Sequence, residues 1–268
     1  MQDYMNSNRA LWNEMTPIHA RSAFYDVDGF KRGRITLGNL EREEVGDVAG
    51  KSLLHLQCHF GMDTMSWARL GASVTGVDFS DEAIALARSL SQELGINARF
   101  IQSNIYDLPD TLDEQFDIVF TSQGVLCWLP DLEGWGQVVA RYLKPGGTFY
   151  ICDGHPMLMA MNDAPGTTTY QISFPYLQGA EPLQFEGGGS DYADQNARLT
   201  HPSFEWIHSL GSIVTALSSA GLRIEFLREF SICAWQALPF LEQGADGWWR
   251  APEGMIPIPM TFSLKAAK

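Results

Sequence analysis

The chain has 268 residues, 45% of them hydrophobic and 19% charged, which is enough apolar material for one large domain or two small ones. Its formal net charge of −14 argues against nucleic acid and anionic membranes as partners, because an acidic surface repels phosphate groups. No apolar run is as long as a membrane span, the N-terminus lacks a secretory pattern, and the four cysteines show no paired spacing. We therefore expect a soluble, cytoplasmic protein with free thiols.

Residues 1–50 are mostly polar, with scattered large apolar side chains, and we expect them to be partly helical. Two interpretations of this segment stay open. It is either a cap that lies over a functional site or an ordinary packing arm.

Strands and helices alternate through residues 51–152. The expected strands are 51–57, 73–79, 98–102, 116–121 and 148–152, and the expected helices are 62–70, 80–94 and 132–142. This alternation is typical of a parallel sheet with helices on both faces.

Residues 153–208 interrupt that rhythm and are rich in glycine, proline and aromatic residues. We predict an insertion that acts as a lid, with a hairpin formed by residues 168–176 and 198–204. Its apolar side chains either line an acceptor pocket or form the insertion's own core; they are Met157, Met159, Met161, Phe174, Tyr176 and Trp206. A helix around 213–217 and strands at 222–230 and 260–265 complete a single domain over 1–268, whose last part is 209–268.

An acidic residue closes the second expected strand. Asp78 follows the turn glycine Gly61 by 17 residues. A carboxylate at this place can bind both hydroxyls of a ribose, and the helix N-terminus at the turn can receive a negative group. The pattern therefore indicates a nucleotide-type cofactor site.

Four landmarks appear in order: the strand, turn and helix around Gly61, then Asp78, then the strand 116–119 leading into 125–129, then Leu-Lys-Pro-Gly-Gly at 143–147. Together they resemble the class I S-adenosylmethionine-dependent methyltransferases, in particular the small-molecule branch. The resemblance covers about residues 50–152 and is weaker over 209–267. It implies an α/β fold with a doubly wound, mostly parallel seven-stranded sheet, a Rossmann-like core at 51–152, an N-terminal helical cap and a lid insertion.

The resemblance also implies a cofactor, S-adenosyl-L-methionine, with S-adenosyl-L-homocysteine as its product. The turn that contains Gln57, His59 and Gly61 would face the methionine end, and Asp78 would bind the ribose. The other implied contacts are Phe79, Asn104 and Ile105 near the adenine and Ser122 and Gln123 near the aminoacyl part.

The turn departs from the family pattern at three positions. Gln57 and His59 stand where two glycines are usual, and His55 stands where an acidic residue is usual. Glycines there permit a close approach of backbone and ligand. The two side chains must therefore point away or contact the ligand themselves, and either could bind the methionine carboxylate.

Methyl transfer is an in-line displacement, in which the protein aligns and desolvates the nucleophile and a base helps a protonated acceptor. The candidate bases are His155, just after the fifth strand, and His208, at the start of a helix. The candidate substrate contacts are Trp128, Asp153, Tyr192 and Trp206. Each of these also has a purely structural interpretation. The histidines lack the spacing of zinc ligands, so we expect no metal.

The leading hypothesis is methylation of a small metabolite at oxygen, nitrogen, carbon or sulfur. One alternative is an NAD(P)-dependent oxidoreductase, which shares the strand-turn-helix-acid plan but needs a Gly-x-Gly-x-x-Gly turn that is missing here. The other is a non-catalytic protein that binds S-adenosylmethionine. The sequence does not predict the oligomeric state or the acceptor.

Overall fold

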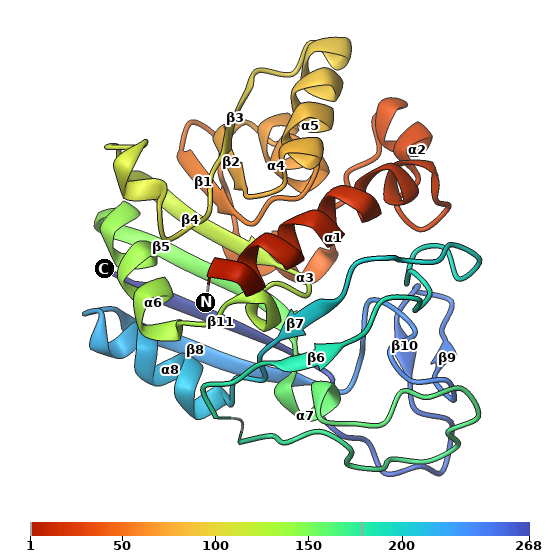
Figure 1. The fold of residues 1–268 in the computed structure, drawn as a ribbon. Helices are drawn as coiled ribbons and strands as arrows, with labels where there is room; N and C mark the ends of the chain where they lie inside the picture. Colours follow the sequence, from red (N-terminus) through yellow and green to blue (C-terminus); the bar gives the residue numbers. More distant parts are fainter. Residues whose placement is uncertain (1, 178) are drawn as a thin grey trace.

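A seven-stranded sheet forms the centre of the protein (Figure 1). The structure is a computed structural model and describes residues 2–177 and 179–268. Five strands pair in parallel: β1 (Ser52–Leu56), β2 (Ser73–Asp78), β3 (Ala98–Gln102), β4 (Phe116–Ser122) and β5 (Leu143–Gly154). Two more, β8 (Arg223–Phe230) and β11 (Thr261–Ala267), complete the order β3-β2-β1-β4-β5-β11-β8. Because β11 is antiparallel to both β5 and β8, the sheet is mostly parallel, and the expected fold class is confirmed.

Helices cover both faces of this sheet. One face packs against α6 (Leu132–Tyr142) and α8 (Leu210–Ser219), and the other packs against α3 (Asn39–Val45) and α4 (Met62–Arg69). The alternation along β1 matches this division: Leu54 and Leu56 belong to the α6 side, whereas Leu53 packs with Trp67 on the α4 side. Burial on both faces explains why the strands read as nearly continuous apolar runs.

Local sequence signals determine the helix that follows β2. In α5 (Asp81–Leu94), the Ser80 side chain accepts a hydrogen bond from the backbone N–H of Ala83, and acidic residues occupy the first turn. Gly95 ends the helix in the left-handed conformation, with φ of 62°. The helix therefore has the bounds that its capping residues predict, and it fixes the direction of the chain just after Asp78.

The N-terminal segment joins the core to the insertion. Its main helix, α1 (Gln2–Arg21), lies between the sheet and the insertion, and a short helix, α2 (Val27–Lys31), follows (Figure 1). Asn13 of α1 donates to Asp81 and accepts from Ser80, at 2.9 and 2.7 Å. Within the described part of the chain, no helix is long and apolar enough to cross a membrane.

The insertion after β5 differs from its expected strand pairing. After α7 (Pro156–Met159), β6 (Leu183–Phe185) pairs antiparallel with β7 (Ser203–Glu205), so the predicted hairpin between 168–176 and 198–204 is wrong. Tertiary contact explains the difference, because Asn8 of α1 bonds both the N–H and the carbonyl of Phe204 and so fixes this strand. Long-range contacts of this kind leave no periodic signal in the insertion itself.

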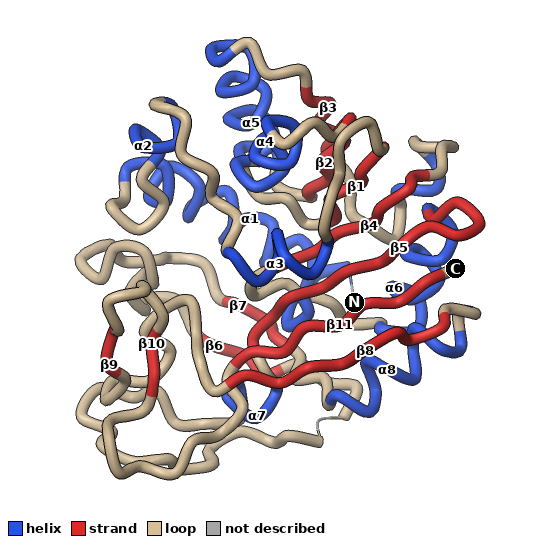
Figure 2. The backbone as a smooth tube through the Cα atoms, turned by 180° about the vertical axis from the view of Figure 1, so that it is seen from behind, coloured by secondary structure: helices blue, strands red, loops and turns tan. Residues whose placement is uncertain are grey.

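The loop-rich segments gather at one end of the sheet (Figure 2). They include a small second hairpin of β9 (Glu242–Gln243) and β10 (Trp249–Arg250). Two 3₁₀ turns, Leu108–Asp110 and Leu126–Trp128, belong to the core and precede and follow β4. A separate apolar cluster joins two irregular segments, the insertion and residues 231–260 between β8 and β11, and consists of Leu158, Met161, Cys233, Leu238, Leu241 and Met260. Met161, and in part Met157, therefore belong to the core of this loop-rich region.

Candidate functional site

The turn between β1 and α4 has an unusual backbone. Gln57, His59 and Gly61 all have positive φ, at 58°, 50° and 76°. Only glycine adopts this conformation freely, and other residues pay about 1–2 kcal/mol each. At Gly61 a side chain is also excluded by space, because a Cβ would lie 2.4 Å from the Phe100 ring. The turn thus keeps a glycine-type backbone while presenting two polar side chains.

Asp78 lies beside this turn at the end of β2. Its Oδ2 accepts from the backbone N–H of His59 at 2.8 Å, and its Oδ1 accepts from that of Ser80 at 2.9 Å. Each carboxylate oxygen has a further lone pair. The residue is only 7% exposed, and this burial raises the pKa of Asp78 to about 6 against the opposing effect of the two N–H groups. An oriented, buried carboxylate therefore faces the turn.

Two side-chain atoms of the turn are buried without a hydrogen-bond partner among the described residues. Gln57 donates through Nε2 to the Val125 carbonyl at 2.9 Å, but its Oε1 has no partner. The Nδ1 of His59 has none either, although its Nε2 lies 2.9 Å from Nδ1 of His19. Since buried polar groups are nearly always paired, these atoms mark a place where a ligand's polar groups can be received.

His19 and Asp191 are site residues that the sequence analysis missed. His19 Nε2 lies 2.9 Å from Oδ2 of Asp191, and both side chains are fully buried. A signal for His19 existed, because Asn8, Thr16 and His19 are the polar members of the buried face of α1. Asp191 had no comparable signal, since it lies in the irregular stretch between β6 and β7.

The predicted adenine and aminoacyl contacts lie at the ends of β2, β3 and β4. Ile105 is buried in the core, Phe79 is half-buried, and Asn104 accepts from the backbone N–H of Tyr106 at 3.2 Å. Ser122 ends β4 and is buried. The side chain of Gln123 donates to Glu41 of α3 at 2.9 Å, so its amide nitrogen is already engaged.

Three of the predicted substrate and catalytic residues meet around one small cavity. Asp153, Trp206 and His208 line a space of about 30 Å³, which suits a water molecule and not a metabolite. Asp153 accepts from the backbone N–H groups of residues 124–126 and is 3% exposed, and burial raises its pKa. His208 Nε2 donates to the Leu129 carbonyl at 2.7 Å. These contacts make Asp153 and His208 supports of the loop after β4, whereas the Trp206 side chain donates to the Ala180 carbonyl of the insertion at 3.1 Å.

The remaining predicted residues lie apart from that cavity. His155 caps α7 by accepting from the N–H of Met157, and its Nε2 lies 2.9 Å from Glu229, so both ring nitrogens are engaged. Trp128 packs edge-on against Trp12 of α1, with ring centroids 5.3 Å apart. Tyr192 is 46% exposed and packs against His19 at 4.8 Å. Trp128 and Tyr192 thus pack against Trp12 and His19, the two α1 residues that contact His59 of the turn, whereas His155 bonds Glu229 of β8.

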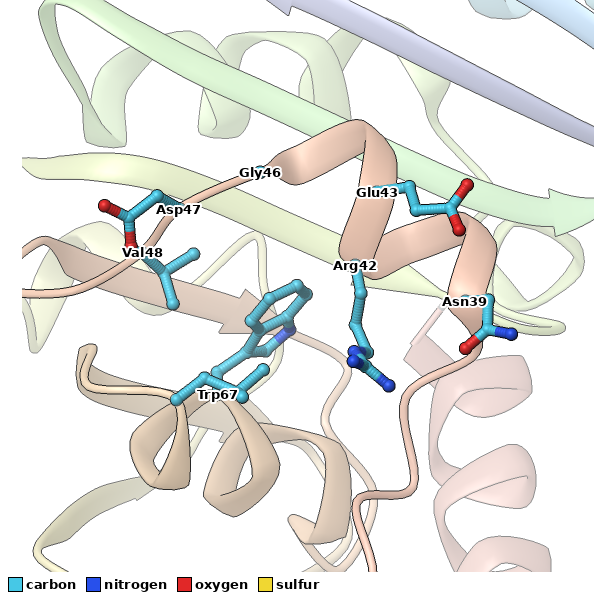
Figure 3. A pocket seen from close by; sticks show the side chains of 8 residues that line it. Asn39, Arg42, Glu43, Gly46, Asp47, Val48 and Trp67 are labelled. Carbon is cyan, nitrogen blue, oxygen red and sulfur yellow. The ribbon is translucent and has the colours of Figure 1, made fainter.

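A larger cavity lies between α3 and α4, with a volume of about 290 Å³ (Figure 3). It is lined by Asn39, Arg42, Glu43, Gly46, Asp47, Val48, Trp67 and Leu70. None of the predicted site residues is among them. Among the described residues, no group of three or more histidine, cysteine, aspartate or glutamate side chains is arranged to hold a metal.

The chain is similar to known methyltransferases in sequence. Residues 54–151 match the methyltransferase domain family. A ubiquinone biosynthesis O-methyltransferase of Klebsiella pneumoniae is 32% identical over 123 residues, which cover 44% of this chain and 50% of that protein. The chain thus spans about half the length of the curated relatives that it matches first.

Solved structures share the fold. An S-adenosylmethionine-dependent methyltransferase from Mesorhizobium loti has a TM-score of 0.58 at 21% identity, covering 85% of this chain and 96% of that one. Another from Clostridium acetobutylicum has a TM-score of 0.58 at 15% identity, covering 96% and 98%. At these identities the similarity shows the fold alone.

Proposed function

Because the chain belongs to the class I methyltransferases, with residues 54–151 as its methyltransferase domain, we propose that it transfers a methyl group from S-adenosylmethionine to a small-molecule acceptor. The observation that carries this proposal is the buried Asp78 carboxylate, oriented by two N–H groups beside a turn with three positive φ angles. A carboxylate so held is suited to a ribose diol.

The described residues fit this cofactor. Asp78 would accept from both ribose hydroxyls through its free lone pairs, and the unpartnered Oε1 of Gln57 would accept from the ammonium of the methionine part. Phe79, Asn104 and Ile105 would border the adenine, and the second lone pair of the Asn104 oxygen would take the adenine amine. Ser122 at the end of β4 would lie near the aminoacyl group. The cofactor, when bound, supplies an activated methyl group on a sulfonium sulfur.

The protein's own contribution is alignment and exclusion of water. Trp128, Trp12 of α1 and Tyr192 of the insertion flank the turn and would wall the acceptor. The structure gives Asp153, Trp206, His155 and His208 structural hydrogen bonds, so we propose that they support the acceptor side and do not transfer protons.

We infer that the acceptor is a small molecule, because the net charge of −14 opposes nucleic acid. The relative from Klebsiella methylates oxygen according to its name, which favours a hydroxyl acceptor here. The four free cysteines and the acidic composition support a cytoplasmic setting.

The test is calorimetric titration of the whole chain with S-adenosylhomocysteine and, separately, with NAD. We expect binding of the thioether alone. Transfer of labelled methyl groups to a panel of phenols, catechols and amines then identifies the acceptor class. Binding of NAD alone would favour the oxidoreductase, and thioether binding without any turnover would favour a non-catalytic binding protein.

A further inference from the structure

Three polar side chains from distant segments form a continuous hydrogen-bonded chain. His59 Nε2 lies 2.9 Å from His19 Nδ1, and His19 Nε2 lies 2.9 Å from Asp191 Oδ2. His59 belongs to the turn after β1, His19 to the last residues of α1, and Asp191 to the stretch between β6 and β7 (Figure 1). The chain therefore links the cofactor turn, the N-terminal helix and the insertion.

The hydrogen-bond partners of Asp191 set the direction of this chain. Its Oδ1 accepts from the backbone N–H groups of Ala193 and Asp194, at 2.7 and 3.1 Å, and its Oδ2 faces His19. A carboxylate that accepts at both oxygens requires a hydrogen on Nε2 of His19. If each of the two rings carries a single hydrogen, Nδ1 of His19 accepts from the Nε2–H of His59, and Nδ1 of His59 keeps a lone pair.

That Nδ1 is buried and has no partner within the described structure. Burial holds the pKa of His59 well below its usual value, which agrees with a neutral ring. The titratable groups around the chain are Tyr25, stacked on His19 at 4.8 Å, Tyr192, which bonds Tyr25, and Asp78, which bonds the backbone of His59.

Aromatic side chains pack around His59. Its ring meets Trp12 edge-on at a centroid distance of 5.1 Å, and Trp12 meets Trp128 at 5.3 Å. Trp12 Nε1 and Gln57 Oε1 are also buried without partners. A donor and two acceptors without partners thus occur together between the cofactor turn and the aromatic side chains of α1.

We propose that His59 is the general base of methyl transfer and that His19 and Asp191 are positioning residues that hold it with Nδ1 free. The proposal rests on the proposed function and assigns the acceptor to molecules with an O–H or N–H at the reacting atom. The acceptor's lone pair forms a bond to the methyl carbon, and the carbon–sulfur bond breaks with its electron pair left on sulfur. The acceptor's proton passes to Nδ1 of His59.

The hydrogen-bonded chain can then disperse the charge on His59. Its Nε2 proton can move to Nδ1 of His19, which places the positive charge against the Asp191 carboxylate. The proton later leaves to solvent, so that one proton is released for each methyl group transferred. This arrangement extends the usual pair of base and orienting carboxylate by one imidazole.

The decisive experiment is nitrogen-15 NMR of the histidine rings in the whole chain at neutral pH, with His59→Gln used to assign the signals. We expect His59 to carry its hydrogen on Nε2 and none on Nδ1. In Asp191→Asn, the amide oxygen must take the place of Oδ1, because two N–H groups point there, and the amide NH₂ then faces His19. This should reverse the chain and put a hydrogen on Nδ1 of His59.

The matched control is Asp194→Asn, since the Asp194 side chain is exposed and accepts only from the backbone N–H of Asn196 among the described residues, and its own backbone N–H to Asp191 is kept in the variant. It should leave the His59 signals unchanged. A hydrogen on Nδ1 of His59 in the unmodified protein, or no reversal in Asp191→Asn, overturns the proposal.

Binding of S-adenosylhomocysteine separates this proposal from the function on which it rests. We expect Asp191→Asn to bind it within about threefold of the unmodified protein, and we expect both Asp191→Asn and His59→Gln to lose about 10²–10⁴-fold in kcat on a hydroxyl acceptor. If the unmodified protein fails to bind the thioether, the proposed function fails. If it binds and His59→Gln keeps the full rate, only the assignment of the base fails.

Discussion

Cofactor affinity should depend on pH through Asp78. The ribose diol donates to the ionised carboxylate, whose pKa is raised to about 6 by burial. The fraction of protein with Asp78 ionised is roughly one tenth at pH 5 and nearly complete at pH 7.5, so the Kd for S-adenosylhomocysteine should rise about tenfold over that interval as the pH falls. A tenfold change corresponds to about 1.4 kcal/mol.

The stability of the ligand-free protein should respond in the opposite direction. The folded-state pKa of Asp78 lies above its ordinary value of 3.8, so the folded protein holds a proton that the unfolded chain has lost between about pH 4 and pH 6. Stability from this group is present below that window and falls as the pH rises through it, by about 3 kcal/mol in total.

Isothermal titration calorimetry from about pH 5 to pH 7.5 in buffers of constant ionic strength measures the affinity. Asp78→Asn is the control, because it removes the titrating group and keeps the shape of the side chain. It should bind more weakly and show no slope over this range. A flat profile in the unmodified protein, or an equal slope in Asp78→Asn, would refute the role assigned to the carboxylate.

Three further substitutions test the architecture of the site. Gln57→Gly should relieve about 1–2 kcal/mol of left-handed strain and lose about 1 kcal/mol with the bond to Val125, so the stability in chemical denaturation should stay within about 1 kcal/mol while thioether binding weakens; a loss above about 2 kcal/mol would contradict the strain. Gly61→Ala should cost more than about 2 kcal/mol in chemical denaturation because of the Phe100 ring, whereas Gly95→Ala, with positive φ and open space, should cost only about 1 kcal/mol. Equal losses would contradict the clash. Asp153→Ala should cost about 3 kcal/mol, measured the same way, because three buried N–H donors lose their acceptor, and a loss under about 1 kcal/mol would argue against that support.

The core of the fold was predictable because its signals are local. Apolar runs, the Ser80 cap and the Gly95 stop define strands and helices without reference to distant residues. The insertion was not predictable in the same way, because β7 is held by Asn8, which lies 196 positions earlier in the chain.

The candidate site was predictable only in part, and for a similar reason. Asp78 and the turn lie in one strand-turn-helix-strand sequence, so their positions in the fold could be predicted from their order along the chain. The bonds of His155 and Asp153 could not be predicted in this way. The two residues lie close together in the sequence at the end of β5, but His155 bonds Glu229 of β8 and Asp153 bonds the loop after β4. His19 shares the helical spacing of Asn8 and Thr16 on α1, which is a signal in the sequence, and Asp191 has no such signal.

The shared apolar cluster of the two irregular segments has a consequence for protein engineering. Leu158 and Met161 come from the first segment, and Cys233, Leu238 and Leu241 come from the second, so neither stretch encloses its apolar side chains alone. A chimaera that takes one of these segments from another protein would lose half of the apolar cluster and expose the other half to water. An exchange of both segments together with β11, the strand that follows the second segment, would keep the apolar cluster complete.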